Sequence, residues 1–477
     1  MEGKAMIPKG IIWPFILLTS LFFAWAVPNN LTDTMLAAFK RIMSLTDSKT
    51  AWIQVACYLL GYGGFAIPAA LFIKKFTYKS GVMLGLVMYA AGTFMFYPAM
   101  QMADTNINFS FLMFLLALVI LFAGLSILET SANSYVYAIG PESTGTQRLN
   151  FAQSFNPFGA ITGVVLSQVF ILSQLNTLSA TERAALPASE LVNIQTLELN
   201  AVTRTYMALG LVMLVLMLAF WFTKMPNLKE GGQPLDFRGT FRRLMKNRNY
   251  IWGVVAQFFY VGAQIAVWSF IIRYVMQQLQ LDALVSQLGK NASPEETISL
   301  LRNVEPLAAA FYNFLELIGI QSFLPRTAEQ AGATYYIISL ILFVVGRFTF
   351  TGLMKYIRPR KLLAALSILA LIMSIITVYA DGWAGIYALI AISGCMSLMF
   401  PTIYGLGIAG LGEDTKIGGA GMIMAIAGAA VLTQIQGIVS DQSGSIKTAF
   451  LVPAFAFLII AWYSLVVSRK TMEPIQG

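Results

Sequence analysis

About twelve long apolar runs occupy most of this 477-residue chain and leave few options for its fold. A helix needs ~20 consecutive, mostly apolar residues to cross the hydrocarbon core of a bilayer. No run shows the short alternating pattern of an outer-membrane barrel. The sequence therefore predicts an all-α polytopic membrane protein with about 12 transmembrane helices. The predicted spans lie near residues 11–39, 50–73, 81–100, 109–138, 149–174, 203–224, 249–279, 333–354, 361–379, 384–409, 417–440 and 448–468.

The composition agrees with a membrane protein. Hydrophobic residues make up 57% of the chain and charged residues only 11%, whereas a soluble domain is about a quarter charged. The first apolar run follows Lys4 and Lys9, as the core of a signal peptide would, but it is far longer than such a core. We therefore expect this run to remain in the protein as its first helix.

The sequence also excludes several kinds of site. It contains no histidine, and its two cysteines, Cys57 and Cys395, lie in separate apolar runs. A histidine-ligated metal, a histidine proton relay and a disulfide framework are therefore excluded. The chain has no phosphate-binding loop of the form G-x-x-x-x-G-K-[ST], which argues against ATP-driven transport. No nucleophile–base pattern indicates an enzyme, and we expect no metal and no cofactor.

The basic residues indicate how the chain is oriented. The net charge of +9 comes from 31 Lys and Arg residues, most of which fall in alternate loops if both termini are cytoplasmic. Examples are the pair Lys74–Lys75 and the stretch 225–248. The positive-inside rule then favours an even number of spans with both ends inside. The excess charge is thus an orientation signal, and we expect no nucleic-acid partner.

The stretch 225–248 also divides the chain into two sets of about six spans. Loops of similar character recur at equivalent places in both sets, which predicts two parallel six-helix repeats and a rocker-type secondary transporter. The paired loops are 74–79 with 355–361 and 140–145 with 411–416. The predicted domains are an N-terminal bundle over 1–224, a cytoplasmic linker over 225–248, and a C-terminal bundle over 249–477 with a long outer loop at 280–332. We expect the chain to function as a monomer.

Two carboxylates, Asp33 and Glu129, lie inside apolar runs. An ionised acid in the middle of a bilayer costs several kcal/mol, so such acids persist mainly where they face a protein interior or a water-filled pathway. Desolvation favours the protonated form of a carboxyl group. The pair is therefore the predicted proton-coupling site. The structural alternative is an ion pair of either acid with Arg273 or Arg347.

Polar residues recur at helical spacing on four of the predicted spans. They are amides, acids and aromatic residues, which is the mixture that binds a sugar, because amides and acids pair with vicinal hydroxyls and aromatic faces cover the ring. A drug efflux antiporter would have a more apolar cavity. For each residue taken singly, an inter-helix hydrogen bond is the alternative. The predicted substrate-binding residues are Asn30, Glu129, Asn133, Asn150, Gln153, Asn156, Gln257, Tyr260 and Gln264.

Several of these residues lie in motifs. The run from Asn29 to Thr34, the segments 140–143 and 148–156, and the segment 256–264 closely resemble the L-fucose:proton symporter family of the major facilitator superfamily. The resemblance implies an inner-membrane sugar:proton symporter with the major facilitator fold. It also implies that Asp33 and Glu129 are the two functional acids and that Asn30, Asn150 and Gln153 contact the sugar.

One departure from the family concerns the sugar itself. Met399 and Phe400 precede Pro401, where the family pattern has a Gln-Tyr pair. The loss of that hydroxyl alters a sugar contact, so the sequence leaves the identity of the monosaccharide open. Relatives in the same larger group take glucose or galactose, and some use sodium. A sodium-coupled glucose or galactose transporter is therefore the main alternative to proton-coupled uptake.

Overall fold

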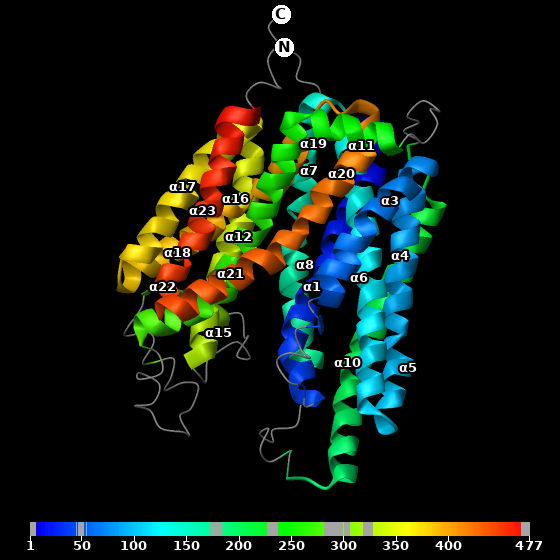
Figure 1. Cartoon of the computed structure of the whole chain (residues 1–477), viewed down its shortest axis with the longest axis vertical. Helices are drawn as coiled ribbons and strands as arrows, with labels where there is room; N and C mark the ends of the chain where they lie inside the picture. Colours follow the sequence, from blue (N-terminus) through cyan, green and yellow to red (C-terminus); the bar gives the residue numbers. More distant parts are fainter. Residues whose placement is uncertain are drawn as a thin grey trace, which may run out of the picture. The chain divides into compact units, whose positions relative to one another are not determined.

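The computed structural model describes residues 6–43, 55–171, 185–226, 237–280, 306–317 and 328–468, together with residues 45, 52, 53, 174, 183 and 299. The described residues form helices joined by turns and contain no β-strand (Figure 1). Eleven of their helical stretches are long and apolar enough to cross a membrane. The helical, polytopic architecture predicted from the apolar runs is confirmed.

The chain forms two compact units, which are described separately. The first unit comprises the described residues of Met1–Gln257 and the segment Pro401–Ala427. Within it α4 and α10 pack together, α6 packs on both α4 and α3, and α1 packs on α8. Its principal helices are α1 (Ile12–Ile42), η2 (Val55–Gly63), α3 (Gly64–Lys75), α4 (Tyr78–Phe94), α5 (Phe96–Gln101), α6 (Ile107–Ala138), α7 (Gly145–Gln153), α8 (Asn156–Phe170), α10 (Ala188–Phe222), α11 (Phe237–Lys246) and α20 (Thr415–Met424).

The second unit comprises the described residues of Phe258–Phe400 and of Gly428–Arg469. Two helices, α12 (Arg248–Leu279) and α19 (Met399–Ile408), run from one unit into the other. Within the second unit α17 packs on α18 and α23, and α16 packs on α18. Its other helices are α15 (Pro306–Leu317), α16 (Ala328–Leu353), α17 (Pro359–Tyr379), α18 (Gly382–Met396), α21 (Gly428–Ser443), α22 (Ile446–Ala449), α23 (Leu451–Trp462) and η8 (Tyr463–Val467).

The predicted fifth span is built from two pieces. α7 ends at Gln153 and α8 begins at Asn156, with Pro157 in its first turn. Proline is tolerated there because the first turn of a helix has free N–H groups. By contrast, α1 continues through Pro28, although this proline could have broken the helix. The predicted division into bundles over 1–224 and 249–477 stays a prediction, as does the cytoplasmic location of both termini.

The matched loops of the two predicted repeats have the same local structure. A 3₁₀ turn at Glu142–Thr144 leads into α7, and a 3₁₀ turn at Gly412–Asp414 leads into α20. Each of these helices is short, with 9 and 10 residues, and ends at an interruption. The second interruption is the 3₁₀ turn η7 (Ala425–Ala427), which precedes α21. This shared pattern supports the internal repeat inferred from the loops.

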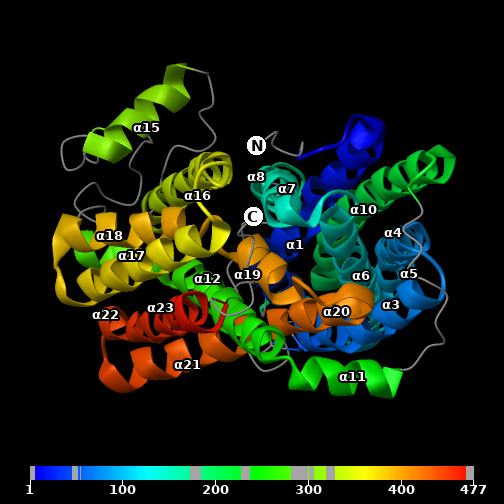
Figure 2. The same cartoon turned by 90° about the horizontal axis from the view of Figure 1, so that it is seen from above.

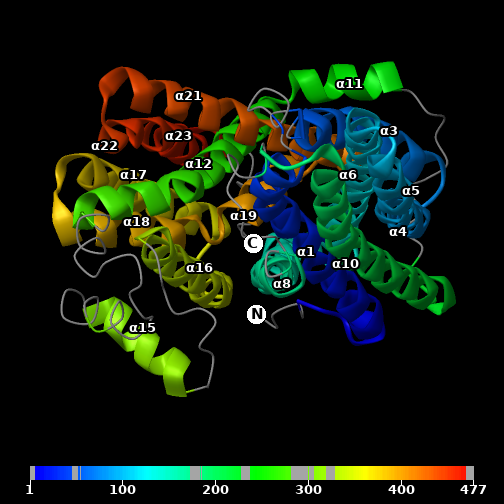
Figure 3. The ribbon, with the colours of Figure 1, turned by 90° about the horizontal axis from the view of Figure 1, so that it is seen from below.

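Glycines allow α1 and α8 to approach closely, and Figure 3 shows the two helices side by side. A Cβ atom on Gly159 would lie 2.1 Å from the Phe23 carbonyl oxygen, and one on Gly163 would lie 2.2 Å from that of Val27. In the second unit a Cβ atom on Gly428 would lie 2.1 Å from the Phe258 carbonyl oxygen. Small residues at such crossings bring helix backbones into contact. Each unit therefore contains at least one backbone-to-backbone crossing.

The linker contains a helix that is fixed to the first unit. α11 packs on α20 (Figure 2). Asp414 accepts hydrogen bonds from Arg243 Nε at 2.8 Å and from Thr240 Oγ1 at 2.9 Å. Lys74 Nζ also donates to Thr240 Oγ1, at 3.3 Å. These contacts join the linker to the ends of α3 and α20.

Candidate functional site

Glu129 lies in α6 and is only 7% exposed. Its Oε1 accepts a hydrogen bond from the Tyr62 hydroxyl at 2.9 Å. The Tyr62 oxygen also accepts a hydrogen bond from Asn29 Nδ2 at 3.1 Å. Within the described part of the chain Glu129 forms no ion pair, which argues against the structural alternative for this acid. Glu129 is thus a buried acid whose carboxylate accepts a hydrogen bond from a neutral donor, the Tyr62 hydroxyl.

Two of the predicted amides extend this network. Asn133, one turn beyond Glu129 in α6, donates from Nδ2 to the Glu129 carbonyl oxygen at 2.8 Å. Its Oδ1 accepts from Gln153 Nε2 of α7 at 2.7 Å. Both side chains are buried. The structure therefore brings together Glu129, Asn133 and Gln153, and adds Asn29 and Tyr62.

Three other predicted amides of the first unit form hydrogen bonds outside the Glu129 network. Asn30 donates to the Ala26 carbonyl oxygen at 2.9 Å, and Asn156 donates to that of Phe22 at 3.2 Å. Asn150 donates to Thr402 Oγ1 of α19 at 3.1 Å. These contacts fix the side chains to helices and do not join them to Glu129. Their role as sugar contacts stays a prediction.

Some of these buried amides keep unused hydrogen-bonding capacity. Within the described part of the chain, Asn150 Oδ1 and both polar atoms of Gln257 are buried without a hydrogen-bond partner. Buried polar atoms are nearly always paired in native proteins, and each exception needs an explanation. A polyol ligand would supply both donors and acceptors. Binding of sugar hydroxyls by these atoms stays a prediction.

The remaining predicted substrate residues belong to the second unit. Tyr260 of α12 is buried and donates to the Met396 carbonyl oxygen at 3.1 Å. The Phe400 ring packs edge-to-face against it, with 6.2 Å between ring centroids. Gln264 is half-buried one turn further along α12. Trp268 follows after another turn and donates to Ser393 Oγ at 3.2 Å.

Arg347 lies in α16, and Asp33 lies in α1. Arg347 is buried, donates to the Ser397 carbonyl oxygen and lies over the Phe343 ring, 4.7 Å from its centroid. Asp33 lies in α1, one turn after Asn29 and Asn30, and its side chain is outside the described part of the structure.

A second buried cation lies at the end of α6. Arg148 is fully buried and donates to the carbonyl oxygens of Val136, at 2.7 Å, and Tyr137. It also donates to Thr144 Oγ1 at 3.1 Å. The last carbonyl groups of a helix have no intrahelical partner. Arg148 therefore caps α6 and ties the loop at Glu142–Thr144 to it.

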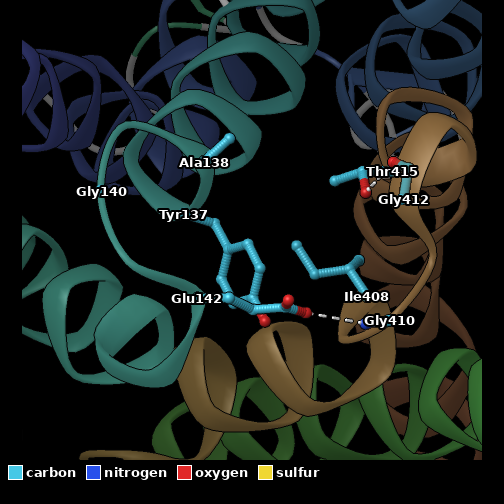
Figure 4. Close-up of a pocket in the computed structure, with 8 residues that line it drawn as sticks. All are labelled: Tyr137, Ala138, Gly140, Glu142, Ile408, Gly410, Gly412 and Thr415. Carbon is cyan, nitrogen blue, oxygen red and sulfur yellow. Dashed lines mark hydrogen bonds between the residues drawn. The ribbon is translucent and has the colours of Figure 1, made fainter. Parts of the chain in front are cut away.

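Next to this cap is a cavity of about 420 Å³ (Figure 4). Its walls come from the end of α6, the following turn, and the segment from the end of α19 to the start of α20. Figure 4 shows Glu142 reaching across to the Gly410 N–H, to which it is hydrogen-bonded at 3.0 Å. None of the predicted coupling or substrate residues lines this cavity. The cavity is therefore separate from the candidate site.

The sequence reasoning missed Tyr62, the direct partner of Glu129. This tyrosine sits among glycines in an apolar segment, Gly61-Tyr62-Gly63-Gly64, and reads as ordinary helix packing. Its spacing from other polar residues gave no sign, because η2 is π-helical and does not follow the 3.6-residue period. The one feature that could have indicated this role is the position of the Tyr62 hydroxyl among glycines, in a predicted span that can pack on the span carrying Glu129.

Comparison with known proteins identifies the family to which this architecture belongs. A family model described as the Major Facilitator Superfamily matches residues 12–429. The chain belongs to the major facilitator superfamily. This superfamily member is 36% identical to the L-fucose-proton symporter of Haemophilus influenzae, over 97% of this chain and 98% of that protein. It is 30% identical to the glucose/galactose transporter of Brucella abortus, over 95% of this chain and 93% of that protein.

A solved structure agrees with these relatives. The major facilitator transporter FucP, in the outward conformation, matches with a TM-score of 0.79 and 35% identity, over 98% of this chain and 100% of that chain. The predicted fold and the resemblance to the L-fucose:proton symporter family are confirmed. The chain is a multi-pass membrane protein whose relatives are transporters, not enzymes.

The Asn133–Gln153 hydrogen bond gives a testable expectation. We expect Gln153→Ala to raise the sugar concentration for half-maximal uptake about tenfold, because it removes a predicted sugar contact and the donor that orients Asn133. One hydrogen bond contributes about 0.5–1.5 kcal/mol net, and 1.4 kcal/mol is a factor of about ten in affinity. Uptake kinetics at fixed pH measure the change, and Gln174→Ala, outside the site, serves as the control. An unchanged half-maximal concentration would contradict the assignment.

Proposed function

We propose that this protein is a secondary active transporter that takes up L-fucose or a related monosaccharide together with protons, by alternating access. Among the described residues, the single observation that carries the proposal is the buried, ion-pair-free Glu129, held by Tyr62 and adjacent to the Asn133–Gln153 amide pair. The names of the L-fucose-proton symporters among its relatives support the same substrate and coupling ion.

In the proposed cycle, Glu129 takes up a proton and thereby becomes neutral. A neutral carboxyl group can donate a hydrogen bond as well as accept one, so sugar and proton binding favour each other at this site. The loaded carrier then changes the side to which the site is open, releases both ligands, and returns empty. Asp33 shares the coupling in this proposal. No cofactor takes part, and a monomer in the bacterial inner membrane carries out the cycle.

The main alternative is sodium-coupled uptake of glucose or galactose. The name of the Brucella relative, a glucose/galactose transporter, supports the substrate of this second candidate. The apolar Phe400 beside Tyr260 leaves the identity of the sugar open. The test is uptake into liposomes containing purified protein, with a panel of L-fucose, galactose, glucose, mannose and arabinose. Imposing a pH gradient and a sodium gradient separately identifies the coupling ion. Accumulation driven by sodium alone would favour the alternative, and absence of sugar flux would overturn both.

Asp33→Asn tests whether Asp33 takes part in proton coupling. We expect this variant to lose accumulation of sugar against its gradient, while exchange of labelled for unlabelled sugar continues, because asparagine keeps a polar side chain but cannot carry a proton. The measurement is accumulation and counterflow in the same liposomes, with medium alkalinisation as the proton readout. Normal alkalinisation during uptake by Asp33→Asn would remove Asp33 from the coupling site.

A further inference from the structure

Tyr62 is fixed on several sides. Its side chain is 1% exposed and stacks on Tyr58, with 6.2 Å between ring centroids. The ring also packs edge-to-face on Phe122 of α6 at 5.7 Å. Its carbonyl oxygen accepts a hydrogen bond from Ser126 Oγ at 2.9 Å. Both the backbone and the ring of Tyr62 are therefore held against α6, on the side where Glu129 lies.

The backbone geometry explains why the hydroxyl reaches Glu129. η2 is a nine-residue π-helical segment. Such segments are rare in proteins, and those that occur often lie at functional sites. Gly61 makes the close approach possible, since a Cβ atom there would lie 2.5 Å from Phe122 Cβ. The wider turn and the missing side chain bring Tyr62 onto α6 at the level of the acid.

The polarity of the hydrogen bonds distinguishes the two states of Glu129. With the carboxylate ionised, the Tyr62 hydroxyl donates to Oε1 while its oxygen accepts from Asn29. A hydrogen bond to a charged acceptor is roughly twice as strong as a neutral one. The contact therefore weakens when Glu129 takes up a proton. Asn29 lies one turn before Asp33 on α1, so the chain of hydrogen bonds joins α1 to the acid of α6.

Other ionisable groups lie on the elements that pack around Glu129 and Tyr62. Tyr404 of α19 interacts electrostatically with Glu129 and is hydrogen-bonded to Ser134. Cys57 of η2 interacts with Tyr62. The charged groups on α3, α7 and α20 have described contacts with other residues, and Asp33 is the acid of α1. Those contacts are Lys74 with Thr240, Arg148 with the end of α6, and Lys416 over the Tyr78 ring.

We propose that Tyr62 is a positioning residue for proton coupling: its hydroxyl stabilises the ionised carboxylate of Glu129 and, through Asn29, ties release of the proton to the arrangement of α1. This inference rests on the proposed function for its role in transport. Its physical content, the dependence of Glu129 protonation on the Tyr62 hydroxyl, stands on the described contacts alone. Tyr62 itself need not touch the sugar.

The test compares Tyr62→Phe with Tyr89→Phe. Tyr89 is a matched control, because it is equally buried in the first unit and its hydroxyl has no hydrogen-bond partner in the described part of the chain. Removing a donor to the ionised carboxylate favours its protonated form. We therefore expect the pH profile of sugar uptake by Tyr62→Phe to move about one unit toward alkaline pH, a tenfold change in proton concentration. Tyr89→Phe should match the unmodified protein.

A second readout separates this inference from the transport proposal. Infrared difference spectroscopy of purified protein follows the carboxyl band that disappears in Glu129→Gln, whether or not sugar is transported. We expect its titration midpoint to move in the alkaline direction in Tyr62→Phe. If the unmodified protein moves no sugar, the proposed function fails while this midpoint still decides the role of Tyr62.

A midpoint in Tyr62→Phe that coincides with that of the unmodified protein would overturn the inference. Should Tyr62→Phe not reach the membrane, Asn29→Ala takes its place. That variant keeps the tyrosine but removes the donor that orients it. We expect a smaller shift in the same direction, and no shift would again overturn the inference.

Discussion

Replacing Glu129 with glutamine is expected to abolish uphill accumulation of sugar. Glutamine has the same shape and keeps an oxygen that can accept from Tyr62, but it cannot carry a proton. One pH unit of proton gradient is worth 1.36 kcal/mol, so one-proton coupling supports about a tenfold accumulation. In Glu129→Gln we expect the ratio of internal to external sugar to fall to about one. Counterflow of labelled sugar should persist, because it needs no net movement of protons.

Accumulation at an imposed gradient of one pH unit measures this loss. Glu190→Gln is the matched control, because Glu190 is an exposed acid in the first turn of α10. It should accumulate sugar as the unmodified protein does. A Glu129→Gln variant that still concentrates sugar would remove the buried acid from the coupling step, and with it the observation on which the proposed function rests.

Substituting Gly159 with valine is expected to destabilise the first unit strongly. The Cβ atom would lie 2.1 Å from the Phe23 carbonyl oxygen and 2.9 Å from Ala26 Cβ. The nearest atom belongs to backbone and cannot rotate away, so α1 and α8 must separate. Overpacking of this kind costs about 1–3 kcal/mol or more. We expect a clear drop in melting temperature and in the yield of monodisperse protein in detergent.

Gly437→Val provides the comparison for this substitution. Gly437 lies in the interior of α21, and a Cβ atom there would have no neighbour within 4 Å. Both variants replace a helical glycine with valine and so change helix propensity equally. Only Gly159→Val adds a side chain at a helix crossing. Equal thermal stability of Gly159→Val and Gly437→Val would mean that the α1–α8 crossing is looser than described.

The sequence was sufficient for the fold because each span had to satisfy its own backbone hydrogen bonds within a long apolar helix. The 3.6-residue period put Glu129 and Asn133 on one face of α6, and the structure joins that face to Gln153 of α7. Tyr62 was missed because η2 departs from that period. The partner of Asn150, Thr402, depends on tertiary contact between residues far apart in sequence, which spacing within one helix cannot reveal.

The two-piece construction of the fifth span has a mechanical consequence. At the join, Ser154 N–H bonds the Phe151 carbonyl oxygen at 3.1 Å and Phe155 N–H bonds that of Ala152 at 3.4 Å. Tighter bonds of this type keep the backbone satisfied where the helix is interrupted. The join has fewer regular helical hydrogen bonds than the helices on either side, so we expect α7 and α8 to bend relative to each other at this point. Spin labels placed on either side of the join should report different amplitudes during turnover.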